Sequence, residues 1–314
     1  MGKTRDHGGN LDAQIARFGG DKADWLDLST GINPVPYPTG TPSDASWAVL
    51  PDQAAQEGLV AAARSFWQVP DDLDILAAPG ASALIARLPA LFSTRAIDIP
   101  QPTYNEHAAA FEAHGYDVTK TAELRVLVHP NNPTGRFWQV SDLSSDTTII
   151  DESFCDIAPE NSLLTAAQDG HIILKSFGKF WGLAGLRIGF MIARPDRIAR
   201  MRELIGPWAV SGPALEIGRA ALLDHDWAAT TRQRLAADAK RLDALMADKG
   251  IALEGGCDLF RLYRVPDAAQ WQEALAQNHV WSRIFPYSKT FLRLGLPAPD
   301  QWDQLEAALS RVNP

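Results

Sequence analysis

The sequence predicts an α/β fold, in which a large domain with a mostly parallel, mixed sheet is followed by a smaller α+β C-terminal domain. Short apolar runs alternate with helical patterns through the first two-thirds of the chain. The last third has its own alternation of strand and helix patterns, and a Gly206-Pro207 step separates the two regions. Short apolar strands between helices are typical of a parallel sheet covered on both faces.

Six apolar runs predict the strands of the large sheet. They cover residues 75–77, 96–99, 126–128, 148–150, 172–174 and 188–192. The helical spacing of Leu59, Val60 and Ala63 predicts a helix over residues 52–68. The other predicted helices cover residues 81–92, 104–114, 195–205 and 213–249, the last with an interruption at 224–227.

The remaining segments complete the predicted organisation. The small domain is expected to have strands at 259–265, 280–284 and 291–294, and helices at 267–278 and 300–311. Residues 31–42 are rich in Pro and Gly, which predicts an extended arm. We therefore expect an N-terminal arm (1–38) that packs on the small domain, a large domain (39–206) and a small domain (207–314).

Composition restricts the partners and the compartment. The net charge of −9 argues against nucleic acid or an anionic membrane as the main partner, although a small anionic ligand remains compatible with it. Neither a secretory signal nor an apolar run of about 18 residues is recognisable. The two cysteines form no CxxC pair and do not cluster in sequence with histidines, so we expect a cytoplasmic protein with no metal site.

The most informative motif surrounds Lys179. The segment Ser176-Phe177-Gly178-Lys179 directly follows a predicted strand, and Arg187 comes eight residues later. A lysine amine in such a setting forms Schiff bases with pyridoxal phosphate, and Ser176 and Arg187 could converge on the phosphate. The alternative is a surface lysine in a turn.

Asp151 occupies the carboxyl end of another predicted strand. Ligands of parallel sheets bind beyond these strand ends, where an aspartate can pair with the pyridine nitrogen of the cofactor. The alternative is a helix N-cap. Asn132 lies in the turn His129-Pro130-Asn131-Asn132-Pro133-Thr134-Gly135, which could aim its amide at the phenolic oxygen of the cofactor or be a plain turn.

Two further segments complete the candidate cofactor site. Gly80, Ala81 and Ser82 open a predicted helix and could cradle a phosphate, or form an ordinary N-cap. Tyr104 follows the strand at 96–99 and could stack on the cofactor ring, or pack in the core.

Arg293 lies inside an apolar strand, where an arginine needs a partner such as a carboxylate. Arg283, at the end of the preceding strand, could point the same way or be exposed at the strand end.

Together these motifs resemble the class I/II aminotransferase superfamily of pyridoxal-phosphate fold type I. The segments His7-Gly8-Gly9-Asn10 and Asp27-Leu28-Ser29-Thr30-Gly31-Ile32-Asn33-Pro34 resemble the branch of histidinol-phosphate aminotransferases and threonine-phosphate decarboxylases, the latter most closely. The resemblance implies a homodimer in which Lys179, Asp151 and Tyr104 are catalytic. Within that homodimer, the resemblance implies that the cofactor is held by Gly80, Ala81, Ser82, Tyr104, Asn132, Asp151, Ser176, Lys179 and Arg187, and the substrate by His7, Gly8, Gly31, Ile32, Asn132, Arg283 and Arg293.

Three positions depart from the family pattern. Phe154 and Leu50 stand where many relatives have tyrosines that contact the cofactor, and Gly31 stands where relatives can have Asn. The activity that the resemblance implies is decarboxylation of L-threonine O-3-phosphate for cobalamin biosynthesis. The alternatives are transamination of the histidinol-phosphate type, or a non-enzymatic cofactor-sensing regulator. Because the same residues serve decarboxylation and transamination, residue types alone leave that choice open.

Overall fold

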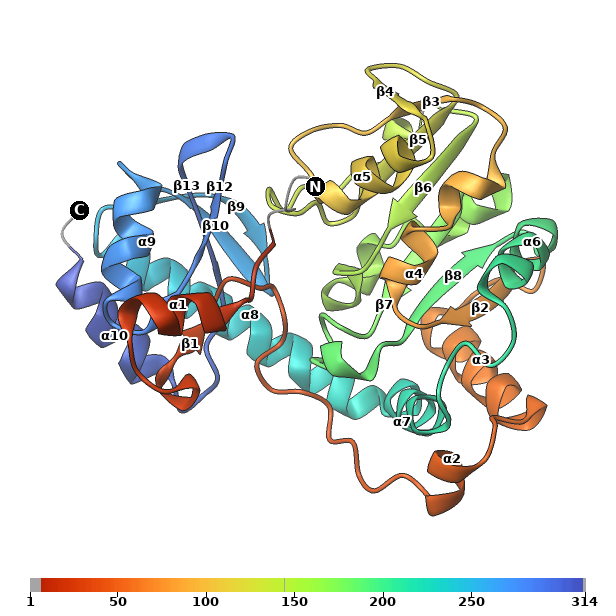
Figure 1. Ribbon diagram of the computed structural model, residues 1–314, viewed down its shortest axis with the longest axis horizontal. Helices are drawn as coiled ribbons and strands as arrows, with labels where there is room; N and C mark the ends of the chain where they lie inside the picture. The colour runs from red at the N-terminus through yellow and green to blue at the C-terminus, as the bar shows by residue number, and fades with distance from the viewer. Residues whose placement is uncertain (1–6, 144, 313–314) are drawn as a thin grey trace. The chain divides into compact units, whose positions relative to one another are not determined.

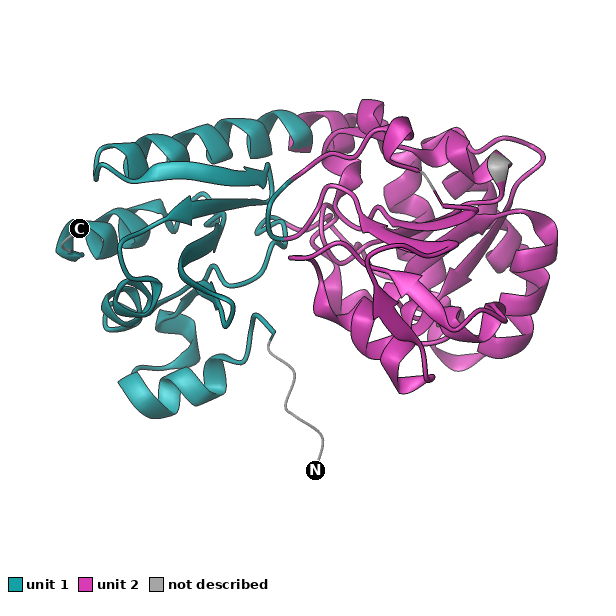
Figure 2. Cartoon of the chain, turned by 90° about the horizontal axis from the view of Figure 1, so that it is seen from above, with its two compact units in different colours: residues 1–35, 133–135, 232–314 teal, residues 36–132, 136–231 magenta. Residues whose placement is uncertain are grey.

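The computed structural model describes residues 7–143 and 145–312, which form two compact units (Figure 2). Unit 2 comprises residues 36–132 and 136–231. Unit 1 comprises the described residues of 1–35, the short segment 133–135 and the described residues of 232–314. Within these described ranges the two units share no sheet, so each is described by itself.

Unit 2 is built on a seven-stranded sheet with the order β2-β8-β7-β6-β5-β3-β4 (Figure 1). Strands β3 to β7 run parallel to one another, whereas β8 runs antiparallel to its neighbours β2 and β7. The strands are β2 (Asp74–Ala78), β3 (Ala96–Asp98), β4 (Asp117–Thr119), β5 (Leu124–Val128), β6 (Thr147–Asp151), β7 (Ile172–Ser176) and β8 (Gly189–Ala193). All six predicted strands are present. The seventh, β4, was not predicted because its three residues are exposed and only one is apolar.

Helices cover both faces of this sheet. The helices of unit 2 include α2 (Asp44–Ala48), which packs against α7, and α3 (Gln53–Trp67), α4 (Ala81–Ile85), α5 (Asn105–Ala113), α6 (Pro195–Ile205) and α7 (Gly212–Leu223). Buried side chains of α4, α5 and α6 pack with Ile149 and Leu174 in one core. Because side chains alternate along a strand, Ile150 and Lys175 point to the opposite face.

The single helix predicted over residues 81–92 is wrong. Helix α4 ends at Ile85, and a short 3-10 helix (Leu88–Leu91) follows. Pro89 lies at the start of this second element. Proline lacks the N–H that would continue an α-helical ladder, so one uninterrupted α-helix cannot form here.

Unit 1 contains a four-stranded antiparallel sheet with the order β12-β13-β10-β9 and a parallel pair of β1 with β11. Its strands are β1 (Leu26–Asp27), β9 (Ala252–Cys257), β10 (Phe260–Arg264), β11 (Val280–Trp281), β12 (Arg283–Phe285) and β13 (Ser288–Gly295). Its helices are α1 (Leu11–Phe18), α9 (Ala268–Ala276), α10 (Trp302–Arg311) and the part of α8 (His225–Ala247) from Arg232 onward.

Two expectations for this region need correction. The strand predicted at 280–284 is two strands in different sheets, β11 and β12, separated by the buried Ser282. Strand β9 was not predicted, because Gly255 and Gly256 weaken its strand signal. These glycines allow close approach: a Cβ on Gly255 would lie 2.3 Å from the carbonyl oxygen of Thr134.

The units also differ from the domain limits expected from the sequence. They divide inside α8, between Thr231 and Arg232, and not at residues 206–207. Residues 207–231 group with unit 2 because α7 packs along α3. Gly206 is instead the C-cap of α6, with a φ of 81° that suits glycine. Among the described residues, each helix is too short or too polar to span a bilayer.

Candidate active site

A cavity in unit 2 opens at the carboxyl ends of the strands. Val128, Asp151 and Ser176 are the last residues of β5, β6 and β7, and all three line it. Parallel strands place their carboxyl ends at one edge of a sheet, which is where ligands of such folds bind. The structure therefore brings together the following predicted cofactor residues: Ala81, Ser82, Tyr104, Asn132, Asp151, Ser176, Lys179 and Arg187.

Asp151 is buried and held by three hydrogen bonds. Its Oδ2 lies 2.8 Å from Nε2 of His107, and its Oδ1 accepts from the backbone N–H and the hydroxyl of Ser153 at 3.0 and 2.5 Å. Burial alone would raise the pKa of the Asp151 carboxyl. His107 and Ser153 outweigh burial and hold that pKa below its ordinary value. The group is therefore a fixed anion at the wall of the cavity.

His107 is a site residue that the sequence analysis missed. It lies on α5, one helical turn after Tyr104, and its side chain is fully buried. Because an ionised carboxylate only accepts hydrogen bonds, Nε2 of His107 carries the proton it shares with Asp151. A single histidine in a helix is usually an ordinary core residue. Its position one helical turn after Tyr104 is the feature of the sequence that could have indicated a place at the site.

Lys179 lies in a turn after β7 and not on an open surface. The backbone N–H of Gly182 donates to its carbonyl oxygen at 3.1 Å, and the flanking Phe177 and Phe180 are fully buried. Its Nζ lies 5.2 Å from the ring centroid of Phe154, which also lines the cavity. Phe154 thus offers the amine an apolar aromatic face that carries no hydroxyl.

Gly80 borders the cavity through Arg187 instead of lining it. Gly80 has a φ of 84°, and a Cβ there would lie 2.6 Å from Nη2 of Arg187. Similarly, a Cβ on Gly189 would lie 2.4 Å from the backbone nitrogen of Ala81. Glycine at positions 80 and 189 thus allows Arg187 and the neighbouring strand β8 to lie close to the start of α4. With Ser82 and Ser176, this arrangement supplies the cation and donors that a phosphate needs.

Replacing Gly80 by alanine is expected to raise the dissociation constant for pyridoxal phosphate about tenfold or more, because the new methyl group displaces Arg187 from the phosphate position. Fluorescence titration of the apoprotein measures this constant. Gly115→Ala is the matched control, since Gly115 also has a positive φ of 78° but nothing lies within 4 Å of a Cβ there. Equal affinities for the two variants would contradict this arrangement.

The predicted substrate residues other than Asn132 belong to unit 1. Nη2 of Arg293 donates to the carbonyl oxygen of Ser29 at 2.6 Å, and a Cβ on Gly8 would lie 2.4 Å from that same oxygen. The hydroxyl of Ser29 also accepts from the N–H of Gly9 at 2.6 Å. Gly31 is buried and Ile32 half-buried just beyond Ser29, and His7 is exposed just before Gly8.

Arg283 and Arg293 are direct neighbours across β12 and β13, so their side chains leave the same face of the sheet. Burial, together with the charge of Arg283, lowers the pKa of Arg293 to about 10. Like charges directly opposite each other destabilise a sheet. An anion that binds both guanidinium groups would remove this cost.

Comparison with known proteins identifies the family. Residues 43–312 match the family model "Aminotransferase class I and II". This chain belongs to that family. The chain is 39% identical to a threonine-phosphate decarboxylase of Sinorhizobium sp over 94% of this chain and 93% of the relative. It is 34% identical to a threonine-phosphate decarboxylase of Pseudomonas aeruginosa over 97% of both chains.

Solved structures of the family share the fold. The histidinol-phosphate aminotransferase of Sinorhizobium meliloti, solved in complex with pyridoxal-5'-phosphate, matches with a TM-score of 0.81 at 18% identity, over 96% of this chain and 93% of that chain. Fold type I and pyridoxal phosphate as the cofactor are therefore confirmed. The cavity fits this cofactor, because it combines an amine, a buried carboxylate, an aromatic ring and a guanidinium.

Proposed function

We propose that this chain decarboxylates L-threonine O-3-phosphate to (R)-1-aminopropan-2-yl phosphate, a step of cobalamin biosynthesis. The observation that carries the proposal is the paired Arg283 and Arg293, which suit a substrate with two anionic groups, a carboxylate and a phosphate. Similarity over nearly the whole chain to two threonine-phosphate decarboxylases supports it.

The roles of the cavity residues follow from their chemistry. When bound, pyridoxal phosphate serves as an electron sink for negative charge that develops at the substrate Cα. Lys179 would hold the cofactor covalently, and Asp151 would keep its ring nitrogen protonated. Asn132 would hydrogen-bond the phenolic oxygen, Tyr104 would stack on the ring, and the phosphate would bind at the start of α4 with Ser176 and Arg187.

Decarboxylation also requires one proton at Cα. The bond from Cα to the carboxylate carbon breaks, CO2 leaves, and the electron pair of that bond stays at Cα. The amine of Lys179, which the substrate amine would have displaced from the cofactor, could then deliver a proton from Nζ to Cα. Arg293 would bind the carboxylate, while His7, Gly8, the backbone of Gly31 and Ile32, and Arg283 would surround the phosphate of the substrate.

Transamination of the histidinol-phosphate type is the alternative that the same residues support. In that reaction Lys179 would remove the proton of Cα and no carbon would leave. A histidinol-phosphate aminotransferase of Mesorhizobium japonicum that is 25% identical to this chain, over 96% of this chain and 92% of the relative, supports this alternative.

Product analysis tests the proposal. We expect the purified holoenzyme to release one CO2 for each phosphothreonine consumed, without any keto-acid acceptor. A keto-acid product, with dependence on 2-oxoglutarate and turnover of histidinol phosphate, would instead establish the aminotransferase.

We further propose that the enzyme is a homodimer. Trp47, Val49 and Leu50 lie within four consecutive residues and are 71%, 63% and 65% exposed, which is unusual for large apolar side chains on a free surface. A second copy covering this segment would remove it from water. Sedimentation equilibrium should give twice the mass of the 34.2 kDa chain, and a mass of 34.2 kDa would contradict the dimer.

We place the enzyme in the cytoplasm. Cys155 and Cys257 are both free thiols and buried, as is usual in a reducing compartment. Cell fractionation tests this assignment, and recovery of the protein outside the cytoplasmic fraction would contradict it.

A further inference from the structure

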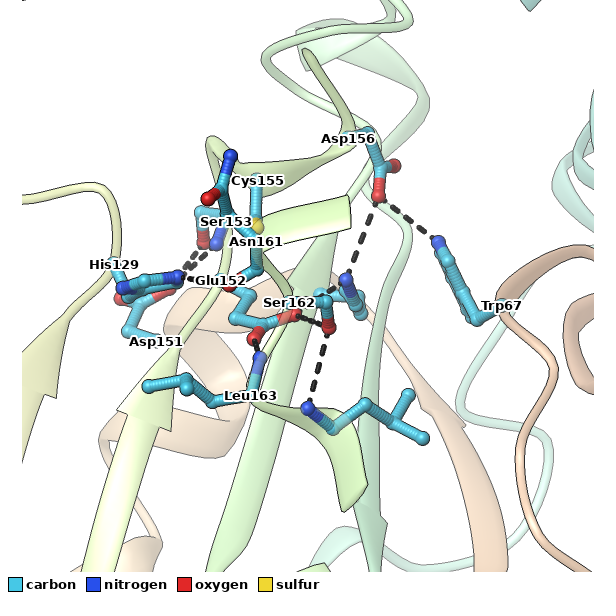
Figure 3. A network of polar contacts seen from close by, with 12 residues as sticks. Trp67, His129, Asp151, Glu152, Ser153, Cys155, Asp156, Asn161, Ser162 and Leu163 are labelled. Carbon is cyan, nitrogen blue, oxygen red and sulfur yellow. Dashed lines mark hydrogen bonds and ion pairs between the residues drawn. The ribbon is translucent and has the colours of Figure 1, made fainter. Parts of the chain in front are cut away.

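A buried charge network that includes Glu152 and Asp156 lies in unit 2 (Figure 3). Nζ of Lys175 lies 2.6 Å from Oε2 of Glu152 and 3.6 Å from Oδ1 of Asp156. Glu152 also accepts from the hydroxyl of Ser162 at 2.7 Å and from the N–H of Leu163 at 2.6 Å. Lys175, Glu152 and Asp156 are each at most 3% exposed.

Lys175 remains charged although it is buried. Burial alone would lower the pKa of its amine, but the charges of Glu152 and Asp156 outweigh burial and raise that pKa above its ordinary value. A buried ion network contributes little net stability compared with apolar packing of the same volume. Its presence therefore suggests that it fixes a particular arrangement of the chain.

The network residues are direct neighbours of cavity residues. Glu152 follows Asp151 in sequence, and Lys175 precedes Ser176 on β7. Adjacent residues in a strand point to opposite faces, so Lys175 enters the network while Ser176 lines the cavity. The network and the cavity are therefore connected through the backbone at the ends of β6 and β7.

A metal ion does not account for this cluster. His129, Glu152 and Cys155 place ligand atoms within 4.8 Å of one another. Both ring nitrogens of His129 are already used, however, because Nδ1 accepts from the N–H of Trp138 at 3.0 Å and Nε2 donates to the carbonyl oxygen of Asn161 at 2.7 Å. Metal binding would have to break one of these bonds.

Trp181 connects the turn of Lys179 to this network. Its indole N–H donates to Oδ2 of Asp156 at 3.0 Å, and its ring is stacked between Phe177 and Trp227, with centroids 5.1 and 5.4 Å away. Trp181 is fully buried and lies two residues after Lys179. This bond therefore attaches the turn to the charge network.

Trp67 makes an equivalent bond from a different element. Its indole N–H donates to Oδ1 of Asp156 at 2.9 Å (Figure 3). Trp67 is the last residue of α3, and α3 contributes no residue to the cavity. The two tryptophans thus donate to the same carboxylate, but only Trp181 belongs to the turn that holds Lys179.

We propose that Trp181 is a positioning residue, whose indole bond to Asp156 ties the turn of Lys179 to the network behind Asp151. The bond fixes the Lys179 amine and the Asp151 carboxylate relative to each other at the cavity. This inference rests on the proposed function only in that Lys179 holds the cofactor, and it does not depend on the substrate.

The pair Trp181→Phe and Trp67→Phe tests the inference. Each variant removes one indole N–H from Asp156, so we expect similar decreases in melting temperature. Only Trp181→Phe should raise the dissociation constant for pyridoxal phosphate, by about tenfold, and alter the visible absorption of the bound cofactor. It should also lower kcat about tenfold with KM unchanged, whereas Trp67→Phe should stay within about twofold of the parent protein in all of these cofactor and rate measurements.

Equal cofactor affinity and equal absorption spectra for the two variants would overturn the inference. If Trp181→Phe folds poorly, benzothienylalanine at position 181 replaces the N–H by sulfur with the ring shape kept, and the same comparison applies. Failure to decarboxylate phosphothreonine would refute the proposed function but leave these cofactor measurements interpretable.

Discussion

Replacement of Lys179 by alanine is expected to lower kcat at least about 10³-fold, because the variant loses both the amine that holds the cofactor and the proton donor for Cα. The visible absorption of the bound cofactor should disappear as well. Steady-state CO2 release and absorption spectra of the purified variant measure the two effects.

Lys120→Ala is the control for the loss of Lys179. Lys120 is exposed in the turn after β4 and outside the cavity, so this variant should keep the activity and spectrum of the parent protein. A Lys179→Ala variant that retained a tenth of the parent kcat would remove Lys179 from the proposed mechanism.

Replacement of Asp151 by asparagine is expected to lower kcat about 10²- to 10³-fold. The amide has the size of the carboxylate, but it carries no charge to keep the cofactor ring nitrogen protonated. Steady-state kinetics with phosphothreonine measure the effect. Because the pKa of Asp151 is held below its ordinary value, its ionisation should not limit kcat at any pH above about 4.

Asp98→Asn is a matched control for Asp151. Asp98 is a buried carboxylate at the end of β3, paired with Arg125 at 3.0 Å, and it does not line the cavity. Its replacement should lower the melting temperature and leave kcat within about twofold of the parent value. Equal losses of kcat in the two variants would indicate a general effect of a lost buried charge and not a role for Asp151 in the reaction.

Most residues that line the cavity could be predicted from the sequence, because several of them lie at or just after the ends of predicted strands. Asp151 and Ser176 terminate apolar runs, and polar residues at the carboxyl ends of parallel strands meet at one edge. Lys179 and Arg187 follow the same strand within one short segment. Such local patterns can be recognised in the sequence without knowing which distant residues pack together.

Features that depend on distant contacts were not predicted. His107 matters because it reaches Asp151, 44 positions away in sequence. The division inside α8 depends on how α7 packs along α3, and a continuous helix carries no signal of it. The network of Lys175 and Trp181 likewise exists only through residues brought together by folding.

The assignment of Lys179 as the covalent attachment of pyridoxal phosphate is tested most directly by borohydride reduction of the holoenzyme. Digestion and mass spectrometry then locate the reduced adduct. We predict the adduct on Lys179 alone. An adduct on Lys175, or on any other lysine in place of Lys179, would contradict the mechanism proposed for this enzyme.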